Sequence, residues 1–248
     1  KYRSVENVLD ELGHVARLGI REIYFDDQTF GAQKPRTLEL CRRMAVELPR
    51  MGWACFSRVD VVDEEFLVAM KRAGCHTIVF GVETGTRGIR DATRKGITPN
   101  QIVDAFELCR RHRVATAATF ILGLPDEREE DLLATMRLAL KLKCDYAAFN
   151  VPIPRMRTQL RSEAISAGLV APSLMRMDQS GTYAVMGTKH LSKTDVERLA
   201  AKAIRQFYLR PSYVLSRFAT IRSYYDLRRH VVAGLAVLRD VVKRVFRR

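Results

Sequence analysis

Several features are absent from this chain of 248 residues, and their absence narrows the class of protein. No run reaches the roughly eighteen consecutive apolar residues that a membrane-spanning helix needs. The first residues, Lys-Tyr-Arg-Ser-Val-Glu, do not form a hydrophobic signal region. No Gly-x-Gly-x-x-Gly pattern follows an apolar run, which disfavours a dinucleotide-binding domain. We therefore expect a cytoplasmic protein that is not built on that nucleotide-binding pattern.

Closely spaced cysteine pairs are also lacking. The five cysteines are odd in number and far apart in the sequence, at Cys41, Cys55, Cys75, Cys109 and Cys144. This pattern predicts reduced, mostly buried thiols and neither disulfides nor a zinc site of the two-residue spacing. Cys109 and His112 could share a helix face as metal ligands, although amphipathic helices often present such a pair by chance.

Acidic residues are scarce in the C-terminal part of the chain. The formal net charge is +14 for the whole sequence, and 205–248 contains eleven Lys or Arg against two Asp. The apolar residues at Val231, Leu235, Leu238, Val242 and Val245 share one face of a predicted helix. Such a helix could make a peripheral contact with anionic lipid, or its apolar face could pack on protein. Nucleic-acid binding is less favoured because few aromatic residues interleave with the charges.

The whole chain is 47% apolar, and helical and strand-like segments alternate along its first 151 residues. Periodicity and capping signals at Asp63, Thr98 and Asp126 predict helices over 5–18, 35–48, 64–73, 99–112 and 127–143. Apolar runs predict strands over 20–25, 53–57, 76–82, 114–122 and 146–151. This alternation predicts an α/β fold with a parallel sheet, either doubly wound or closed toward a barrel.

The alternation begins with a helix and ends near Pro154. We therefore expect a further strand upstream of residue 1. Residues 155–190 show no clear period and predict a loop-rich connection, whereas 192–208 and 213–246 are typical of helices. We divide the chain into a core domain over 1–160 and a loop-rich connection with a basic helical extension over 161–248.

Polar or turn-forming residues follow the predicted strands, at Asp26 and Asp27, at Ser57 and Arg58, at Glu83, and at Gly123. Because the carboxyl ends of parallel strands meet at one edge, we expect Asp26, Asp27, Arg58 and Glu83 to converge. Arg58 suits a carboxylate or phosphate, an aspartate suits an ammonium group, and Glu83 suits a diol. An amino acid joined to a nucleoside combines these groups.

A purely structural interpretation of the same residues is open. In this interpretation Asp26 caps a turn, Arg58 pairs with Asp60, and Glu83 caps a short helix that follows it.

The order of motifs resembles the radical S-adenosylmethionine (SAM) enzymes, in particular the branch with an upstream cobalamin-binding domain. The resemblance covers about residues 2–160. It is carried by Phe25-Asp26-Asp27-Gln28-Thr29-Phe30, Ser57-Arg58-Val59-Asp60, Ala73-Gly74-Cys75, Phe80-Gly81-Val82-Glu83-Thr84-Gly85, Lys95-Gly96-Ile97-Thr98 and Phe120-Ile121-Leu122-Gly123-Leu124-Pro125. Each motif alone is weak, and their succession is specific.

The resemblance implies a partial six-stranded (β/α) barrel, without its first strand, that binds SAM at the strand ends. It places Asp26 and Asp27 at the methionyl ammonium, Ser57 and Arg58 at the methionyl carboxylate or ribose, and Glu83 at the ribose hydroxyls. It also places Ile121, Leu122 and Gly123 beside the adenine. Gly123 has a physical rationale of its own, because a residue without a β-carbon lets the backbone approach a flat ring.

The family's reaction further implies a [4Fe-4S] cluster, an electron donor such as flavodoxin or ferredoxin, and a small-molecule substrate. It implies a transferase or other radical enzyme that generates a 5′-deoxyadenosyl radical or supports cobalamin-dependent methyl transfer to an unactivated carbon. The family's Cys-x3-Cys-x2-Cys triplet is absent here, and we expect those ligands, and the cobalamin domain, upstream of residue 1. The chain alone is then expected to be inactive.

A second departure concerns the substrate. After the fifth predicted strand the family often has Pro-Gly-Thr, whereas this chain has Pro154-Arg155-Met156-Arg157-Thr158. Two other functions stay open from the sequence: a degenerate barrel that serves as a non-catalytic scaffold, and a nucleotide-dependent α/β enzyme.

Overall fold

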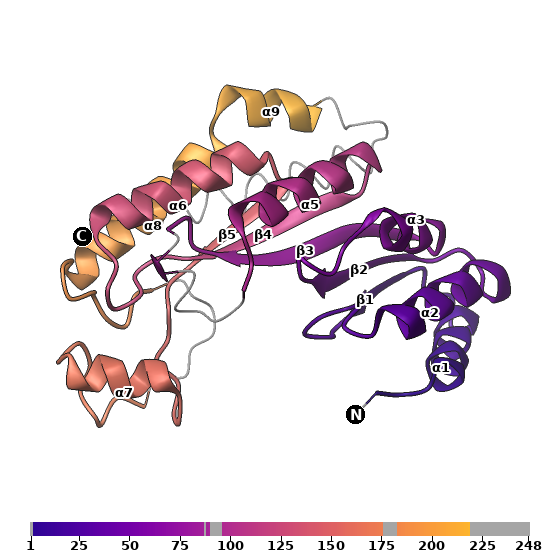
Figure 1. Cartoon of the computed structure of the whole chain (residues 1–248), viewed down its shortest axis with the longest axis horizontal. Helices are drawn as coiled ribbons and strands as arrows, with labels where there is room; N and C mark the ends of the chain where they lie inside the picture. Colours follow the sequence, from indigo (N-terminus) through magenta and orange to yellow (C-terminus); the bar gives the residue numbers. More distant parts are fainter. Residues whose placement is uncertain (1, 87, 90–95, 176–182, 219–248) are drawn as a thin grey trace. The chain divides into compact units, whose positions relative to one another are not determined.

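The computed structural model describes residues 2–86, 88–89, 96–175 and 183–218. Its elements alternate as the sequence predicts (Figure 1). The helices are α1 (Val5–Arg17), α2 (Lys34–Glu47), α3 (Glu64–Arg72), α5 (Pro99–Arg111), α6 (Glu129–Leu142), α7 (Gln159–Ser166), α8 (Lys193–Tyr208) and α9 (Pro211–Phe218). The strands are β1 (Glu22–Phe25), β2 (Gly52–Ser57), β3 (Cys75–Glu83), β4 (Ala115–Ile121) and β5 (Tyr146–Asn150).

The five strands form one parallel sheet in the order β1-β2-β3-β4-β5, so each strand neighbours the next one in the sequence. Glu22 is opposite Gly52, and Phe25 is opposite Cys55 in the register of β1 and β2. The predicted α/β class is confirmed, and a parallel sheet of this order agrees with the expected partial barrel. Because the strands are parallel, all of them run toward their carboxyl ends in the same direction.

Residue contacts divide the chain into two units. The first contains residues 1–82, 94–119 and 142–146, and the second contains 83–93, 120–141 and 147–248. Helices α1, α2, α3 and α5 therefore belong to the first unit, and α7, α8 and α9 to the second. The expected division of the sequence near residue 160 stays a prediction.

An aromatic cluster fills the core of the first unit. The indole of Trp53 lies 5.1 Å from the ring of Phe25 and 5.0 Å from that of Phe30, and the Phe30 and Phe66 rings stack at 6.3 Å. Trp53 is fully buried, and its Nε1 donates a hydrogen bond of 2.8 Å to the carbonyl oxygen of Ala73. The indole therefore joins β2 to the end of α3 with its polar atom satisfied.

The second unit has its own aromatic core. Phe120 and Phe149 stack at 5.3 Å, and Phe207 of α8 lies 6.2 Å from Phe149. The Tyr208 hydroxyl accepts a hydrogen bond from the Ala147 amide at 3.1 Å and donates one to the Ala147 carbonyl at 2.8 Å. These contacts join α8 to β5.

Two predicted helix starts are confirmed and one is wrong. The Asp63 carboxylate accepts a hydrogen bond from the Phe66 amide, and Thr98 and Gln101 form a complete capping box. Asp126 does not cap α6, because the helix begins only at Glu129 and Asp126 pairs instead with Lys189. The intervening turn is held by Glu127, as described below.

The structure also corrects the expected loop over 155–190, because α7 lies within it. This helix has no clear apolar period, since one of its buried positions is Arg161. The Arg161 guanidinium donates to the carbonyl oxygens of Pro154 at 3.2 Å and of Pro172 and Leu174 at 2.8 Å. The apolar periodicity of an amphipathic helix requires an apolar residue at this buried position, and the sequence has an arginine whose polar atoms are paired with carbonyl groups. The helix was therefore not predicted.

None of the helices in the described ranges is long and apolar enough to cross a membrane. The predicted helix over 213–246 is described only as far as Phe218, the last described residue, and the apolar face expected to contact lipid lies outside the described residues.

Candidate cofactor site

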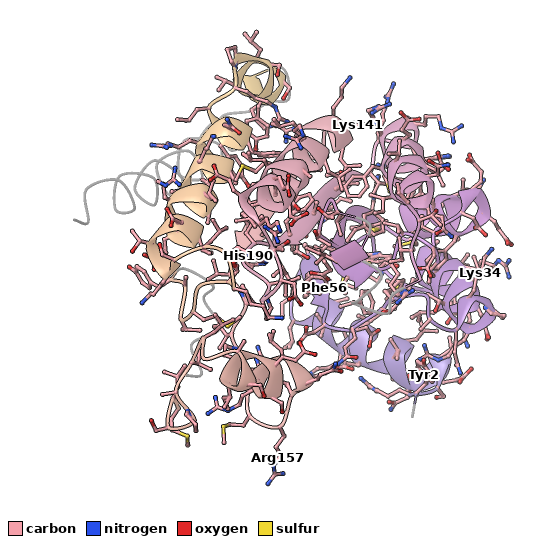
Figure 2. The ribbon with its side chains drawn as sticks, turned by 60° about the vertical axis from the view of Figure 1, so that its left-hand side comes forward. Tyr2, Lys34, Phe56, Lys141, Arg157 and His190 are labelled. Atoms are coloured by element: carbon pink, nitrogen blue, oxygen red, sulfur yellow. The ribbon has the colours of Figure 1, made fainter. Side chains whose placement is uncertain are left out.

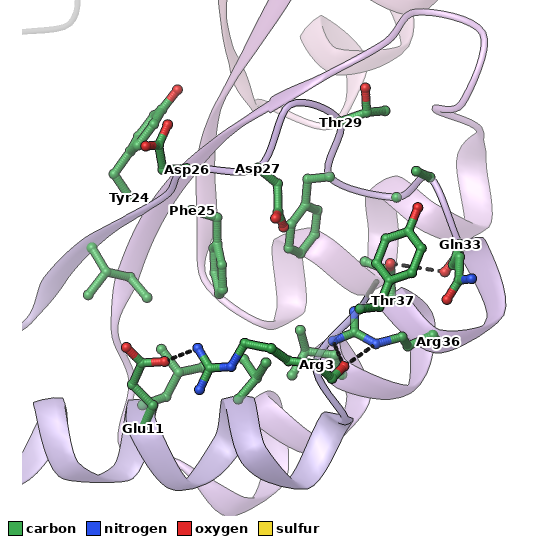
Figure 3. A pocket seen from close by; sticks show the side chains of 18 of the residues that line it. Arg3, Glu11, Tyr24, Phe25, Asp26, Asp27, Thr29, Gln33, Arg36 and Thr37 are labelled. Carbon is green, nitrogen blue, oxygen red and sulfur yellow. Dashed lines mark hydrogen bonds and ion pairs between the residues drawn. The ribbon is translucent and has the colours of Figure 1, made fainter.

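Asp26 and Asp27 directly follow β1 in the first unit, where they line a cavity of about 530 Å³ with residues of α1 and α2. Figure 3 shows Phe25 and Asp27 pointing into this cavity, with Asp26 beside Tyr24. Arg3 crosses the opposite side, where its guanidinium pairs with Glu11. The cavity therefore presents carboxylates and a guanidinium, and its size suits a small ligand.

The segment after β2 is held by internal hydrogen bonds. Ser57 is buried, and its hydroxyl donates to the carbonyl oxygen of Phe30 at 2.8 Å. The Phe30 amide in turn donates to the Phe56 carbonyl at 2.8 Å. Ser57 thus fixes the loop after β1, which carries the two aspartates, against the end of β2.

Arg58 makes a two-point ion pair with Asp60. Its Nε and Nη2 lie 2.9 and 2.7 Å from the two carboxylate oxygens, and this pairing raises the pKa of Arg58. The ion pair that the structural interpretation predicted is confirmed. Asp60 thereby orients the Arg58 guanidinium, which stays partly exposed to solvent at the end of β2.

Glu83 is the last residue of β3, and its backbone has a φ of 69°. This left-handed conformation is rare for a residue with a side chain and costs about 1 to 3 kcal/mol. Backbone conformations of this kind cluster at functional sites, where the surrounding structure holds them in place. The three residues that follow, Thr84, Gly85 and Thr86, form a turn that we call the β3 turn.

Three consecutive residues of the β3 turn contact α6 and Glu127, which lies just before that helix. The Thr84 hydroxyl lies 3.4 Å from Glu127 Oε1, the Gly85 amide donates to Thr135 Oγ1 at 2.8 Å, and the Thr86 hydroxyl donates to an Asp131 oxygen at 3.0 Å. A β-carbon at Gly85 would lie only 2.7 Å from backbone atoms of Ala134 and Thr135. Only glycine allows this close approach of the turn to the helix.

Ile121 ends β4, and residues 122–125 form the turn that follows, which we call the β4 turn. Leu122 is fully buried, and its amide donates to the Asn150 carbonyl at 2.9 Å. Gly123 has a φ of 100°, and a β-carbon there would lie 2.7 Å from Cγ1 of Val196. The backbone conformation and the close packing of Val196 therefore both favour glycine at this position. These two reasons add to the one from the sequence, which was the approach of a flat ring.

Glu127, which the sequence analysis did not single out, lies at the centre of these contacts. Its Oε2 accepts hydrogen bonds from the amides of Gly123 at 2.7 Å and Leu124 at 2.9 Å. Burial raises the pKa of this carboxyl from 4.5 to about 7, against the lowering effect of the two amides. In retrospect the spacing is a signal: Glu127, Asp131 and Thr135 recur every four residues, with Glu127 just before α6 and the other two on one face of it.

No group of three or more His, Cys, Asp or Glu side chains in the described ranges has the arrangement of a metal site. All five cysteines are free and buried, as predicted. Burial raises the pKa of Cys41 and of Cys109 to about 12, so both thiols are poor ligands and poor nucleophiles. His112 pairs with Glu64, and its partnership with Cys109 in a metal site is not supported.

The loop after β5, where the sequence departs from the family pattern, leads into α7. Thr158 caps the helix by accepting from the Arg161 amide at 3.3 Å, and its hydroxyl donates to the Arg155 carbonyl at 2.7 Å. Arg157 has a φ of 62° and an exposed side chain, which projects from the turn in Figure 2. The segment Pro154–Thr158, which differs from the Pro-Gly-Thr expected from the resemblance, thus carries two exposed arginines, Arg155 and Arg157.

The structure places the predicted site residues in two groups. Asp26, Asp27, Ser57 and Arg58 follow β1 and β2 in the first unit. The second group, in the second unit, contains Glu83, Ile121, Leu122 and Gly123, and the β3 and β4 turns that carry it are joined through Glu127. The convergence of all the ionic groups around one ligand stays a prediction.

Comparison with known proteins finds relatives both by sequence and by structure. A protein at 36% identity over 213 residues, 86% of this chain and 46% of the relative, is described as an uncharacterized methyltransferase of Pyrococcus horikoshii. Among solved structures, the radical SAM methyltransferase TsrM of Kitasatospora setae, with cobalamin and a [4Fe-4S] cluster, matches with a TM-score of 0.61 at 21% identity over 68% of this chain and 33% of its own. The cobalamin-dependent SAM radical enzyme OxsB matches with a TM-score of 0.62 at 16% identity over 96% and 42%.

These structural likenesses concern the fold, and the chain spans less than half the length of these relatives. The family model for the radical SAM superfamily matches residues 1–139, more than half of the chain. The match includes both aspartates after β1, the Ser57–Arg58 pair, Glu83 and the β4 turn. This chain belongs to the radical SAM superfamily of enzymes.

Proposed function

We propose that this chain is the SAM-binding core of a radical enzyme that transfers a methyl group to a carbon atom of a small molecule. The family membership carries this proposal, together with the positions of the polar groups at successive strand ends. The methyltransferase names of the Pyrococcus relative and of TsrM support methyl transfer. Cobalamin, an electron-donor protein and an upstream cobalamin domain belong to the same proposal.

The residues present suit the adenosyl and methionyl groups of SAM. Asp26 and Asp27 would pair with the ammonium group, and Arg58, oriented by Asp60, would meet the carboxylate or ribose. Ser57 supports this edge through its bond to the Phe30 carbonyl. Glu83 would accept from the ribose hydroxyls, and Ile121 to Gly123 would flank the adenine. SAM, when bound, supplies the methyl group or the adenosyl radical for the reaction.

The cysteines in the described residues do not fit a [4Fe-4S] cluster, because they are buried on separate elements and form no metal-binding group. We therefore assign the cluster ligands to residues upstream of residue 1, and we derive no step through the cluster from this chain.

The proposal is tested in the protein expressed from its complete gene and purified without oxygen. The measurements are iron and sulfide content, SAM binding by equilibrium dialysis, and 5′-deoxyadenosine or methylated product after reduction. Bound iron and SAM with either product are the expected result. A protein that binds neither is a scaffold, the alternative that the sequence left open. Preference for NAD or ADP over SAM would instead support a nucleotide-dependent enzyme.

A further inference from the structure

Glu127 is fully buried, and it contacts three segments that are far apart in the sequence. Its Oε2 accepts both amides of the β4 turn, and its Oε1 faces the Thr84 hydroxyl of the β3 turn. Its backbone carbonyl accepts a 2.8 Å hydrogen bond from the Thr188 hydroxyl, in the segment that precedes α8. A single side chain thus joins the ends of two neighbouring strands.

The connection is reinforced on both sides. Thr135 Oγ1 lies 3.3 Å from the Thr84 hydroxyl and accepts from the Gly85 amide, so α6 contacts the β3 turn one helical turn beyond Asp131. The Lys189 amide donates to the Pro125 carbonyl at 2.8 Å, which fixes the far end of the β4 turn. The β3 turn is therefore held by α6, and the β4 turn by Glu127 and by the segment that precedes α8.

The two turns carry the residues to which we assign the adenosyl group. Glu83 directly precedes the β3 turn, and Gly123 lies in the β4 turn. The ribose and the adenine are covalently joined, so their binding residues must keep a fixed separation to act together. Loss of the connection would let each turn move separately and would weaken binding without removing any group that touches the ligand.

We propose that Glu127 is a positioning residue that holds the β3 and β4 turns in fixed register and thereby sets the affinity for the adenosyl part of SAM. The second half of this statement rests on the function proposed above. No contact between Glu127 and the ligand is required, because the carboxyl is enclosed by the two turns, α6 and the segment before α8.

The chemistry of the carboxyl offers a matched pair of variants. In Glu127→Gln, the amide oxygen can accept from Gly123 and Leu124 while the NH₂ group donates to Thr84, as a protonated carboxyl would. Glu127→Ala removes every one of these bonds. Glu130→Ala is the control, because Glu130 is an exposed residue of α6 only three positions after Glu127.

The experiment uses the protein expressed from its complete gene. Hydrogen exchange is measured for the peptides that cover 83–86 and 121–127, and SAM affinity is measured by equilibrium dialysis. We expect Glu127→Ala to raise exchange in both peptides and to weaken SAM binding by roughly 10- to 100-fold, as loss of supporting residues does at metal sites. Glu127→Gln should restore binding to within about threefold, since it keeps the hydrogen-bond geometry, and Glu130→Ala should match the wild type.

The outcomes separate the two proposals. If the wild type binds SAM and Glu127→Ala binds it equally well, Glu127 does not position the site and the inference is wrong. If the wild type does not bind SAM but Glu127→Ala still exposes both turns, the register role stands and the proposed function fails. Should Glu127→Ala not fold, Thr84→Val tests the same register, because it removes only the hydroxyl on the β3 side; normal binding by that variant overturns the inference.

Discussion

Val196 of α8 occupies the space that a side chain at Gly123 would need. The nearest approach would be 2.7 Å, from Cγ1 of Val196 to the added β-carbon. The position also has a φ of 100°, so two separate penalties apply to any substitution. One is a steric conflict between elements, and the other belongs to the backbone itself.

We expect Gly123→Ala to lower the free energy of unfolding by about 2 to 4 kcal/mol, from the combined backbone strain and overpacking. In the Val196→Ala background the steric part is relieved and the strain is not. The double-mutant cycle should therefore show a favourable coupling of about 1 kcal/mol. Urea denaturation of the four proteins measures it, and simple additivity would mean that Val196 is not the obstacle.

The raised pKa of Glu127 predicts a pH dependence of stability. The pKa is about 7 in the folded protein, against an ordinary value of 4.5 for a solvated glutamate, so the folded protein binds this proton more tightly than the unfolded chain does. The resulting stabilisation is complete below about pH 4.5 and is lost as the pH rises through 7. Burial is the main cause of the raised pKa of Glu127, and the Coulombic interaction with Asp131 raises it further.

Between pH 5 and pH 8 we expect the wild type to lose about 2 to 3 kcal/mol relative to Glu127→Gln, which cannot titrate. The comparison is made by urea denaturation at matched pH, because the difference between the two proteins cancels the contributions of other groups. Parallel pH profiles for the two proteins would show that the carboxyl does not titrate in this range.

Glu83 allows strain and function to be separated. Glu83→Ala removes the carboxylate and keeps the left-handed backbone, whereas Glu83→Gly removes both the carboxylate and the strain. The glycine variant should be more stable than the alanine variant by about 1 kcal/mol. Both should weaken SAM binding by about 1 to 3 kcal/mol, through loss of charge-assisted hydrogen bonds to the ribose. Wild-type affinity in both variants would contradict the ribose assignment.

Arg161 predicts a stability effect confined to the second unit. Arg161→Met keeps the length of the side chain but leaves the carbonyls of Pro154, Pro172 and Leu174 without their donor. We expect a loss of about 2 to 4 kcal/mol and faster hydrogen exchange over residues 154–175. Arg155→Met is the matched control, because Arg155 is exposed, and it should change neither measurement.

The five buried thiols give a direct check of the core. None should react with a disulfide reagent in the native protein at pH 8, because burial excludes the reagent and raises the pKa of Cys41 and of Cys109 to about 12. All five should react in denaturant. A thiol that reacts rapidly under native conditions would contradict the buried placement on these elements.

Local sequence signals predicted the helix starts that depend on neighbouring residues. Asp63 and Thr98 cap their helices because the cap bonds reach only three residues along the chain. Asp126 has the same signal, but the carboxylate of Glu127 binds the amides of Gly123 and Leu124 and the helix begins later. The cap signal at Asp126 fails because Asp126 pairs with Lys189, which is distant in the sequence, while Glu127 holds the turn before the helix.

The missed helix α7 has a different cause. Apolar periodicity identifies helices that bury apolar side chains, whereas α7 buries Arg161 against carbonyl oxygens of its own surroundings. Those carbonyl groups lie up to 13 residues from Arg161 along the chain. The eight residues of the helix therefore carry no apolar periodicity that would predict it.

The sequence by itself determined the alternation of helices and strands, the polar residues at the strand ends and the family, because each depends on short-range periodicity or on motifs read in order. Only the tertiary structure decided the pairing of Thr84 with Glu127, which are 43 residues apart, the contact of Gly123 with α8, and the neutral-range pKa of a glutamate. These properties arise from burial and from partners that chain folding brings together, and neither is encoded in any local stretch of residues.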